Sequence, residues 1–169
     1  MKRLILIRGP ICAGKSTTVD LLSGILDDCS VVDQDLLKRT IDKKKRSPWR
    51  SRIALDTALY LADLLMKEGR DIIADIHSAI PGQYDEYKKL AEKHQYQMFS
   101  FLLYPPLDVC LQRNRERVIS DVWYQLGDDD IEKYWGKVYR VEGEAVFDTS
   151  VVATEDVVSE ILRVIGGKE

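Results

Sequence analysis

The segment Gly9–Ser16 has the residue types and the spacing of a phosphate-binding loop. It reads Gly-Pro-Ile-Cys-Ala-Gly-Lys-Ser and fits the pattern Gly-x-x-x-x-Gly-Lys-Ser/Thr. The two glycines let the backbone curl so that its N–H groups point at phosphate oxygens, and Lys15 supplies a positive charge to the terminal phosphates. The Ser16 hydroxyl is the expected ligand of Mg²⁺. The pattern predicts nucleotide binding by Gly9, Ala13, Gly14, Lys15, Ser16 and Thr17.

Carboxylates are expected near this loop from two other parts of the chain. Asp75 ends an apolar run, the position from which an acid holds Mg²⁺ directly or through water. Asp33 and Asp35 follow a second short apolar run. An acid there can hold an attacking hydroxyl in line with the terminal phosphate, or accept its proton, or simply cap the next helix. We expect Asp35 to be the catalytic one, because it starts the helix and faces the cleft.

Two arginines are candidates for stabilising transferred charge. Arg113 and Arg117 belong to the run Arg-Asn-Arg-Glu-Arg and would share one helix face, while Arg115 points elsewhere. Guanidinium groups can stabilise the charge that develops in phosphoryl transfer. We predict a lid over about residues 113–140 that brings Arg113 to the nucleotide, the alternative being a solvated helix end. Thr149, in the run Asp-Thr-Ser, either edges the adenine site or belongs to a plain turn.

Basic residues beside Asp35 bear on the second substrate. Between positions 38 and 52 there are eight Lys and Arg residues against a single acid, Asp42. This cluster either holds a phosphorylated or polyanionic acceptor or forms a solvated basic loop. We expect the acceptor to be bound by Asp35, Lys38, Arg39 and His77. His77 could instead make an ordinary hydrogen bond, and His94, in a Lys-His-Gln run at a helix end, is expected to be solvated.

Apolar runs alternate with helical patterns along the chain, which predicts a parallel sheet covered on both faces. In such sheets ligands bind at the carboxyl ends of the strands. We therefore expect an α/β fold of the P-loop NTPase type, in three layers, with five parallel strands and a helical lid. The expected strands are 4–8, 30–33, 71–75, 97–104 and 144–148, and the expected helices are 15–26, 35–42, 52–67, 83–93, 107–118 and 154–165, with one or two short helices between 119 and 144.

Composition is that of an ordinary soluble protein. The chain has 169 residues, 45% of them hydrophobic, and a net charge of −3, which favours one domain over residues 1–169 and no general attraction to nucleic acid or membrane. Three unpaired cysteines indicate a reducing, cytoplasmic location. Cys12 lies beside an expected helix N-terminus, which would lower the pKa of its thiol. The apolar run at the start is too short for a signal peptide or a membrane span.

With these residues in hand, the chain resembles small P-loop kinases of the polynucleotide kinase type and, more loosely, gluconate, shikimate and chloramphenicol kinases. In polynucleotide kinases an Asp that activates the 5′-hydroxyl is followed three residues later by Arg; here these positions are Asp35 and Lys38. Lysine cannot clamp a phosphate in a bidentate way. The lid pattern Arg-Asn-x-x-Arg is matched by Arg113, Asn114 and Arg117.

The resemblance implies an ATP- and Mg²⁺-dependent kinase that transfers the γ-phosphate to a hydroxyl acceptor. The 5′-hydroxyl of a polynucleotide is one candidate acceptor; nucleosides, nucleotides and small molecules such as sugars or antibiotics are the alternatives. A nucleotide-binding switch or an ATPase is the alternative function outside the kinases. The chain has no Asn-Lys-x-Asp guanine motif, and no Glu follows Asp75 as in a dedicated ATPase.

Overall fold

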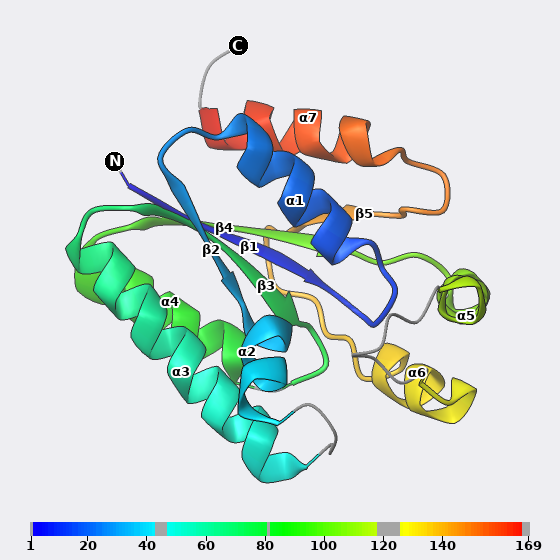
Figure 1. Ribbon diagram of the computed structural model, residues 1–169. Coiled ribbons are helices and arrows are strands. Elements are labelled where there is room, and N and C mark those ends of the chain that lie inside the picture. Colours follow the sequence, from blue (N-terminus) through cyan, green and yellow to red (C-terminus); the bar gives the residue numbers. More distant parts are fainter. Residues whose placement is uncertain (1, 43–46, 81, 118–125, 167–169) are drawn as a thin grey trace.

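The computed structural model describes residues 2–42, 47–80, 82–117 and 126–166 of the chain. Strands and helices alternate in it as the sequence pattern predicts (Figure 1). In chain order the elements are β1 Arg3–Gly9, α1 Lys15–Ile25, β2 Cys29–Asp33, α2 Gln34–Ile41, α3 Pro48–Lys67, β3 Asp71–His77, α4 Gln83–His94, β4 Gln97–Leu103, α5 Leu107–Glu116, α6 Asp128–Trp135, β5 Ala145–Phe147 and α7 Thr154–Gly166.

The five strands form one parallel sheet in the order β2-β3-β1-β4-β5. In this register Ile5 of β1 lies opposite Ile73 of β3 on one side and opposite Phe99 of β4 on the other. Because all strands run the same way, their carboxyl ends meet at one edge, where the loop after β1, α5 and α6 are found (Figure 1). The predicted five-stranded parallel α/β fold is confirmed.

The sheet separates two apolar layers, because successive strand residues point to opposite faces. Ile5, Ile7 and Ile73 pack with α1 and α7 on one face. Leu4, Leu6 and Ile72 pack with α3 and α4 on the other face. Figure 1 shows these helix pairs on opposite sides of the sheet. Strands buried on both faces are held firmly, so the loops at their ends sit on a rigid base.

Two of the differences from the predicted element boundaries affect residues near the site. Helix α3 begins at Pro48 rather than Arg52, because Ser47 caps it by accepting a hydrogen bond from the N–H of Arg50 and because proline suits the first helical turn. Strand β3 continues to His77, which pairs with Gly9, so Asp75 lies inside the strand rather than after it. The basic break is therefore shorter than expected.

The prediction that His94 is solvated is wrong. Its Nε2 lies 2.8 Å from Oδ1 of Asp63, between α4 and α3. Lys67 and Lys93 also contact the Asp63 carboxylate, and hydrogen bonds from Lys67, Lys93 and His94 hold the pKa of Asp63 well below its usual range. The cluster joins two helices on the face opposite α1 and α7. Within the described ranges, no helix is both long and apolar enough to cross a membrane.

Candidate active site

The phosphate-loop motif connects β1 to α1 at the carboxyl edge of the sheet. Its first glycine is needed for close approach, since a Cβ on Gly9 would lie 2.5 Å from the carbonyl oxygen of Leu103 in β4. Gly14 has φ 93° and occupies the N-cap of α1, where it offers no side chain to the first helical N–H groups. Those N–H groups have no partner within the helix, so they suit an anion. Lys15 folds over the loop, and its Nζ donates to the carbonyl of Pro10 at 3.0 Å.

Ser16 and Asp75, the two expected metal ligands, are brought together. Ser16 Oγ donates to Asp75 Oδ2 at 3.3 Å, and Lys15 Nζ lies 3.9 Å from Asp75 Oδ1. Burial raises the pKa of Asp75 to about 6; the positive charge of Lys15 opposes the rise, and Asp35 and Asp33 add to it. A bound cation would relieve this penalty. Thr17, the next residue of the motif, is exposed on α1.

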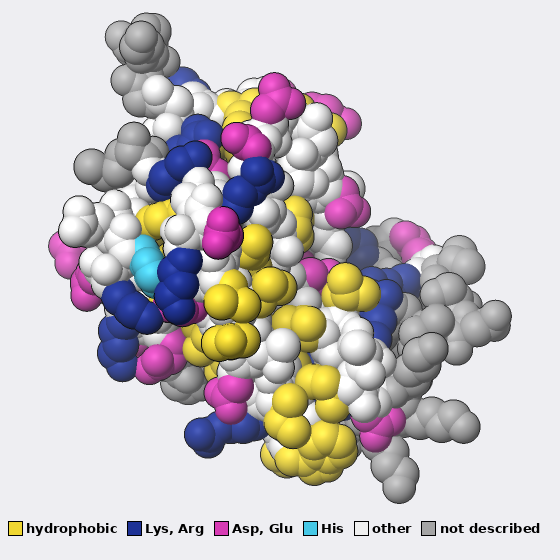
Figure 2. Space-filling model, turned by 60° about the vertical axis from the view of Figure 1, so that its left-hand side comes forward, with side chains coloured by type: hydrophobic (Ala, Val, Ile, Leu, Met, Phe, Trp, Pro, Cys, Tyr) yellow, Lys and Arg dark blue, Asp and Glu magenta, His cyan; other side chains and the backbone are white. Residues whose placement is uncertain are grey.

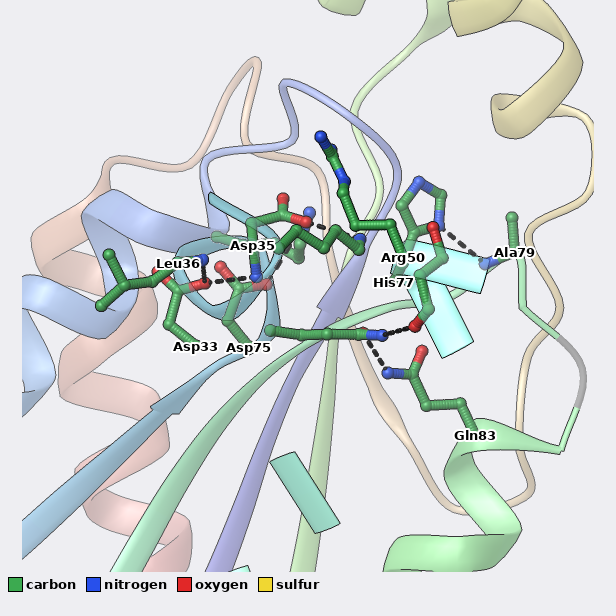
Figure 3. A network of polar contacts seen from close by, with 12 residues as sticks. Asp33, Asp35, Leu36, Arg50, Asp75, His77, Ala79 and Gln83 are labelled. Carbon is green, nitrogen blue, oxygen red and sulfur yellow. Dashed lines mark hydrogen bonds and ion pairs between the residues drawn. The ribbon is translucent and has the colours of Figure 1, made fainter. Parts of the chain in front are cut away.

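The structure separates the roles of the two acids after β2 (Figure 3). Asp33 is the cap of α2: its Oδ1 accepts hydrogen bonds from the N–H groups of Asp35 and Leu36 at 2.8 and 3.0 Å. The Asp35 carboxylate is thereby left out of capping. It pairs instead with Lys38 Nζ at 2.7 Å and remains 60% exposed. Of the two acids, Asp35 is thus the one whose side chain can meet a substrate.

The protonation state of Asp35 follows from its neighbours. Crowding by the protein raises its pKa, but the charge and hydrogen bond of Lys38 outweigh this, and with Lys15 and His77 they lower the pKa to about 2. Asp35 is therefore ionised at neutral pH and is a weak base. It can accept a hydrogen bond from a hydroxyl and orient it. Arg39, the residue after Lys38, is half-buried.

Arg113 of α5 contacts both the phosphate loop and the segment after β5. Its Nη1 donates to Thr149 Oγ1 at 2.9 Å and to the carbonyl of Cys12 at 3.3 Å, and its Nη2 donates to the carbonyl of Thr149 at 2.5 Å. Thr149 Oγ1 in turn donates to the carbonyl of Ala13 at 2.9 Å. Thr149 thus links Arg113 to Ala13, so these three predicted nucleotide-binding residues lie in one hydrogen-bonded group. Asp148 and Ser150 form a plain turn, in which Ser150 donates twice to Asp148.

Arg117 and Cys12 lie close together at the same edge. Arg117 is the residue after α5. Of the nearby charges, that of Arg117 has the largest effect on the pKa of the Cys12 thiol. The expectation of a lowered pKa for Cys12 is wrong: burial raises it, and Arg117, Lys15 and Arg113 only oppose the rise. Arg115 points elsewhere, as expected, and pairs with Asp128 at 2.5 Å.

Two aromatic residues of α6 pack against the carboxyl edge of the sheet. Tyr134 of α6 meets the His77 ring edge-on, with 5.2 Å between ring centroids, and Trp135 stacks on Tyr104 at 4.9 Å. Trp135 also donates to the carbonyl of Pro105. His77 Nδ1 accepts from the N–H of Ala79 at 3.2 Å. Trp123 and Tyr124 fall outside the described residues.

The basic segment is seen only in part, because residues 43–46 fall outside the described ranges. Arg50 is 6% exposed and donates to the carbonyl of Asp42 at 2.7 Å, whereas Arg52 is exposed on α3. Exposed apolar side chains, Trp49 and Ile53 among them, lie on the same helix. On the side where α3 lies, charges of both signs are mixed with hydrophobic side chains (Figure 2). The described part of this segment is not a uniformly basic surface.

Two pairs of buried polar side chains were not predicted from the sequence. Arg8 is fully buried and pairs with Glu144 at 2.6 Å, directly before the phosphate loop. Gln34 and Gln83 are buried and hydrogen-bonded to each other at 2.5 Å. A charge at the end of the apolar run of β1 was a signal that a buried partner must exist. Glutamine carries no such signal.

Two cavities among the described residues lie away from Lys15, Asp35 and Asp75. One of about 580 Å³ is lined by Lys2, Arg3 and Asp71 at the amino ends of the strands. The other, of about 190 Å³, lies beside Glu144 and Ser100. Neither is lined by Lys15, Asp35 or Asp75. The candidate active site is therefore identified by its side-chain contacts and not by a cavity.

A family model described as an AAA domain matches residues 4–132 of the chain. The chain belongs to this family. It is also similar in fold to several solved structures, and the expected resemblance to P-loop kinases is confirmed. No curated protein sequence matched it.

Three of these structures illustrate the likeness. A tunicamycin resistance protein of Deinococcus radiodurans has a TM-score of 0.72 and 19% identity, over 98% of this chain and 96% of that one. A gluconokinase of Sinorhizobium meliloti has a TM-score of 0.68 and 13% identity, over 96% and 91%. A chain of the Pnkp1/Rnl/Hen1 RNA repair complex has a TM-score of 0.70 and 15% identity, over 80% and 43%. At these identities the likeness concerns the fold.

Proposed function

We propose that this protein is an ATP-dependent kinase that transfers the γ-phosphate to a hydroxyl group of a small molecule. The proposal rests on the different roles of Asp33 and Asp35, the two acids that follow the buried part of β2. Because Asp33 caps α2, the ionised carboxylate of Asp35 is available at the same edge as Lys15 and Asp75. A protein that only binds or hydrolyses a nucleotide needs no acid at this position. The kinase-like fold and family support the same class of reaction.

The residues at the edge fit a nucleotide with Mg²⁺. Ser16 Oγ and Asp75 Oδ2 are hard oxygen donors 3.3 Å apart, and the described residues hold no group of three or more acidic, His or Cys side chains that would bind a metal by itself. Mg²⁺ typically takes one or two protein oxygens together with phosphate oxygens and water. Ser16 and Asp75 would hold the ion, and when bound it neutralises charge on the phosphates.

The other residues would position the reactants. Lys15 and the N–H groups at the start of α1 would bind the terminal phosphates. Asp35 would accept a hydrogen bond from the acceptor hydroxyl and hold its oxygen toward the γ-phosphorus. Its low pKa makes orientation, rather than strong basicity, its main contribution. Arg113 and Arg117 would add positive charge where charge develops during transfer.

The 5′-hydroxyl of a polynucleotide is the second candidate acceptor. The likeness to a chain of an RNA repair complex supports it, and so does the spacing of Asp35 and Lys38, although Lys38 stands where the polynucleotide kinase pattern has Arg. Two observations favour a small acceptor instead. The Lys38 amine is engaged by Asp35, and Arg50 is buried against the carbonyl of Asp42. Neither is presented as an exposed phosphate contact.

Transfer from γ-labelled ATP to sugars, nucleosides, antibiotics and 5′-hydroxyl oligonucleotides tests the proposal. We expect a labelled small-molecule product, which Lys15→Ala abolishes without unfolding the protein. Asp35→Asn should keep ATP affinity and lose most of the transfer, while Asp20→Asn, at an exposed position of α1, serves as the matched control. ATP hydrolysis without transfer to any acceptor, equal in wild type and Asp35→Asn, would contradict a kinase.

A further inference from the structure

A hydrogen bond across one turn of α2 holds the Asp35 carboxylate. Nζ of Lys38 donates to Oδ1 of Asp35 at 2.7 Å, from three residues further along the helix. Within the described ranges this is the one hydrogen bond that either side chain makes. The Lys38 side chain is only 14% exposed, whereas that of Asp35 is 60% exposed. The protein therefore holds one oxygen of the carboxylate and leaves the other, Oδ2, open to a substrate.

A pair with the same spacing on α4 shows that the burial of Lys38 does not follow from spacing alone. Glu86 and Lys89 are hydrogen-bonded at 2.8 Å, but their side chains are 48% and 69% exposed. Exposed pairs of this kind restrain their side chains only weakly. The ammonium of Lys38 has lost most of its contact with water, so it depends on Asp35 as its partner. The direction of the Asp35 carboxylate is thereby restrained.

A phosphate on the acceptor would be a poor alternative partner for Lys38. A lysine that binds a substrate phosphate must present its ammonium at the surface, and little of the Lys38 side chain is exposed. The phosphate would also have to approach Asp35, which is ionised at neutral pH and repels an anion. Lysine lacks the fork of N–H groups with which arginine clamps a phosphate. These observations favour a role for Lys38 toward Asp35 over a role toward the acceptor.

Two neighbours thus fix Asp35 in different ways. Asp33 caps α2 and accepts from the N–H of Asp35, which holds the backbone, and Lys38 holds the side chain. Asp35 and Asp75 act on each other electrostatically, and Figure 3 shows both at the carboxyl edge of the sheet. A group that orients a reacting hydroxyl must itself be held in one geometry.

We propose that Lys38 is a positioning residue, which holds the Asp35 carboxylate by Oδ1 so that Oδ2 faces the acceptor hydroxyl. Lys38 then affects phosphoryl transfer through Asp35 and makes no contact of its own with the acceptor. This inference rests on the proposed kinase function. It follows that loss of Lys38 lowers kcat rather than raising the KM of the acceptor, whether or not the acceptor carries a phosphate.

Kinetics of Lys38 variants test the inference, with γ-labelled ATP and with gluconate, adenosine, adenosine 3′-phosphate and every other acceptor found in the transfer screen. Lys38→Met should lower kcat about ten- to hundredfold on each acceptor that wild type phosphorylates, with the KM of ATP and of the acceptor nearly unchanged. Lys38→Arg keeps a charged donor and should restore most of the rate. Lys89→Met removes the matched pair on α4 and should have no effect.

Two further measurements show whether Lys38 acts through Asp35. In the Asp35→Asn background, Lys38→Met should cause no further loss of kcat. NMR titration of the Asp35 carboxylate in the substrate-free protein should give a higher pKa in Lys38→Met than in wild type. Burial then raises this pKa with only Lys15 and His77 left to lower it. If Lys38→Met folds poorly, Lys38→Gln serves in its place, because it also removes the charge.

The outcomes that contradict the inference differ from those that contradict the kinase function. Unchanged kcat in Lys38→Met, or full additivity with Asp35→Asn, would overturn the inference and leave the kinase intact. A rise in KM confined to adenosine 3′-phosphate would make Lys38 a phosphate contact instead. Absence of transfer by wild type to any acceptor, with ATP still bound, would overturn the kinase function itself and the inference with it.

Discussion

Replacing Arg8 by Met is expected to destabilise the protein more than any surface substitution. Arg8 ends the apolar run of β1, and its Nη1 lies 2.6 Å from Glu144 Oε1, with both side chains fully buried. Its Nη2 donates to the carbonyl of Tyr139 at 3.0 Å. The guanidinium also lies 4.7 Å from the ring centroid of Tyr139 and 5.3 Å from that of Tyr84. The pair ties the segment after α6 to the strand that carries the phosphate loop.

The magnitude follows from what the variant leaves behind. Without Arg8, the Glu144 carboxylate stays buried with the Ser100 hydroxyl at 2.5 Å and the N–H of Val141 at 3.4 Å. Removing one partner of a buried ion pair costs about 3–5 kcal/mol. For a chain of this size each kcal/mol lowers Tm by about 2–4 °C, so we expect a fall of about 6–20 °C.

Thermal and urea unfolding of three variants measures this. Arg8→Met should lose the full amount of about 3–5 kcal/mol of stability. Glu144→Gln should lose less, because the glutamine oxygen can still accept a hydrogen bond from Arg8. The double variant Arg8→Met/Glu144→Gln should be destabilised by markedly less than the sum of the two single losses, since no unpaired charge remains. Arg163→Met, which breaks the exposed pair with Glu160, is the control and should leave Tm unchanged. A loss for Arg8→Met no larger than the control's, or strict additivity in the double variant, would refute the reasoning.

Four further predictions concern the site. Gly9→Ala should lower nucleotide binding and Tm together, since its Cβ would meet a backbone oxygen at 2.5 Å; calorimetry with an ATP analogue checks this, and unchanged affinity would count against it. Arg113→Lys should raise the KM for ATP about tenfold and lower Tm by a few degrees, because lysine cannot hold the Thr149 and Cys12 oxygens at once. The folded-state pKa of Asp35, about 2, lies below its unfolded value, so the stability it contributes is present above that value and lost as pH falls toward 2. Its carboxylate thus stays charged from pH 7 to 9, a range above the pKa of Asp75, and Asp35→Asn should lower kcat about 10²–10⁴-fold evenly across that range; a defect that varies with pH there would contradict this. Neutralising all four basic residues at 43–46 should leave transfer to a small-molecule acceptor and its salt dependence unchanged, whereas a steep rise in KM for an oligonucleotide with a reduced salt slope would favour a polynucleotide acceptor.

Local patterns were enough to predict the nucleotide loop and the class of fold. The glycines of the loop and the alternation of apolar strands with amphipathic helices depend on residue type and near neighbours, so they are legible in the sequence. The start of α3 was also encoded locally, in Ser47 and Pro48, but the surrounding run of charges obscured it. Asp33 and Asp35 were both reasonable caps, and the observed hydrogen bonds were needed to show that Asp33 takes that role.

The sequence by itself determined where phosphate chemistry is expected, and the tertiary structure decided which side chains share that place. Arg8 meets Glu144 across 136 positions, Gln83 meets Gln34 across 49, and Arg113 meets Thr149 across 36. These partners come together because β1 pairs with both β3 and β4 and because all strands end at one edge. No local pattern specifies strand order, since it results from packing both faces of the whole sheet at once. Contacts that depend on that order are therefore visible only in the folded chain.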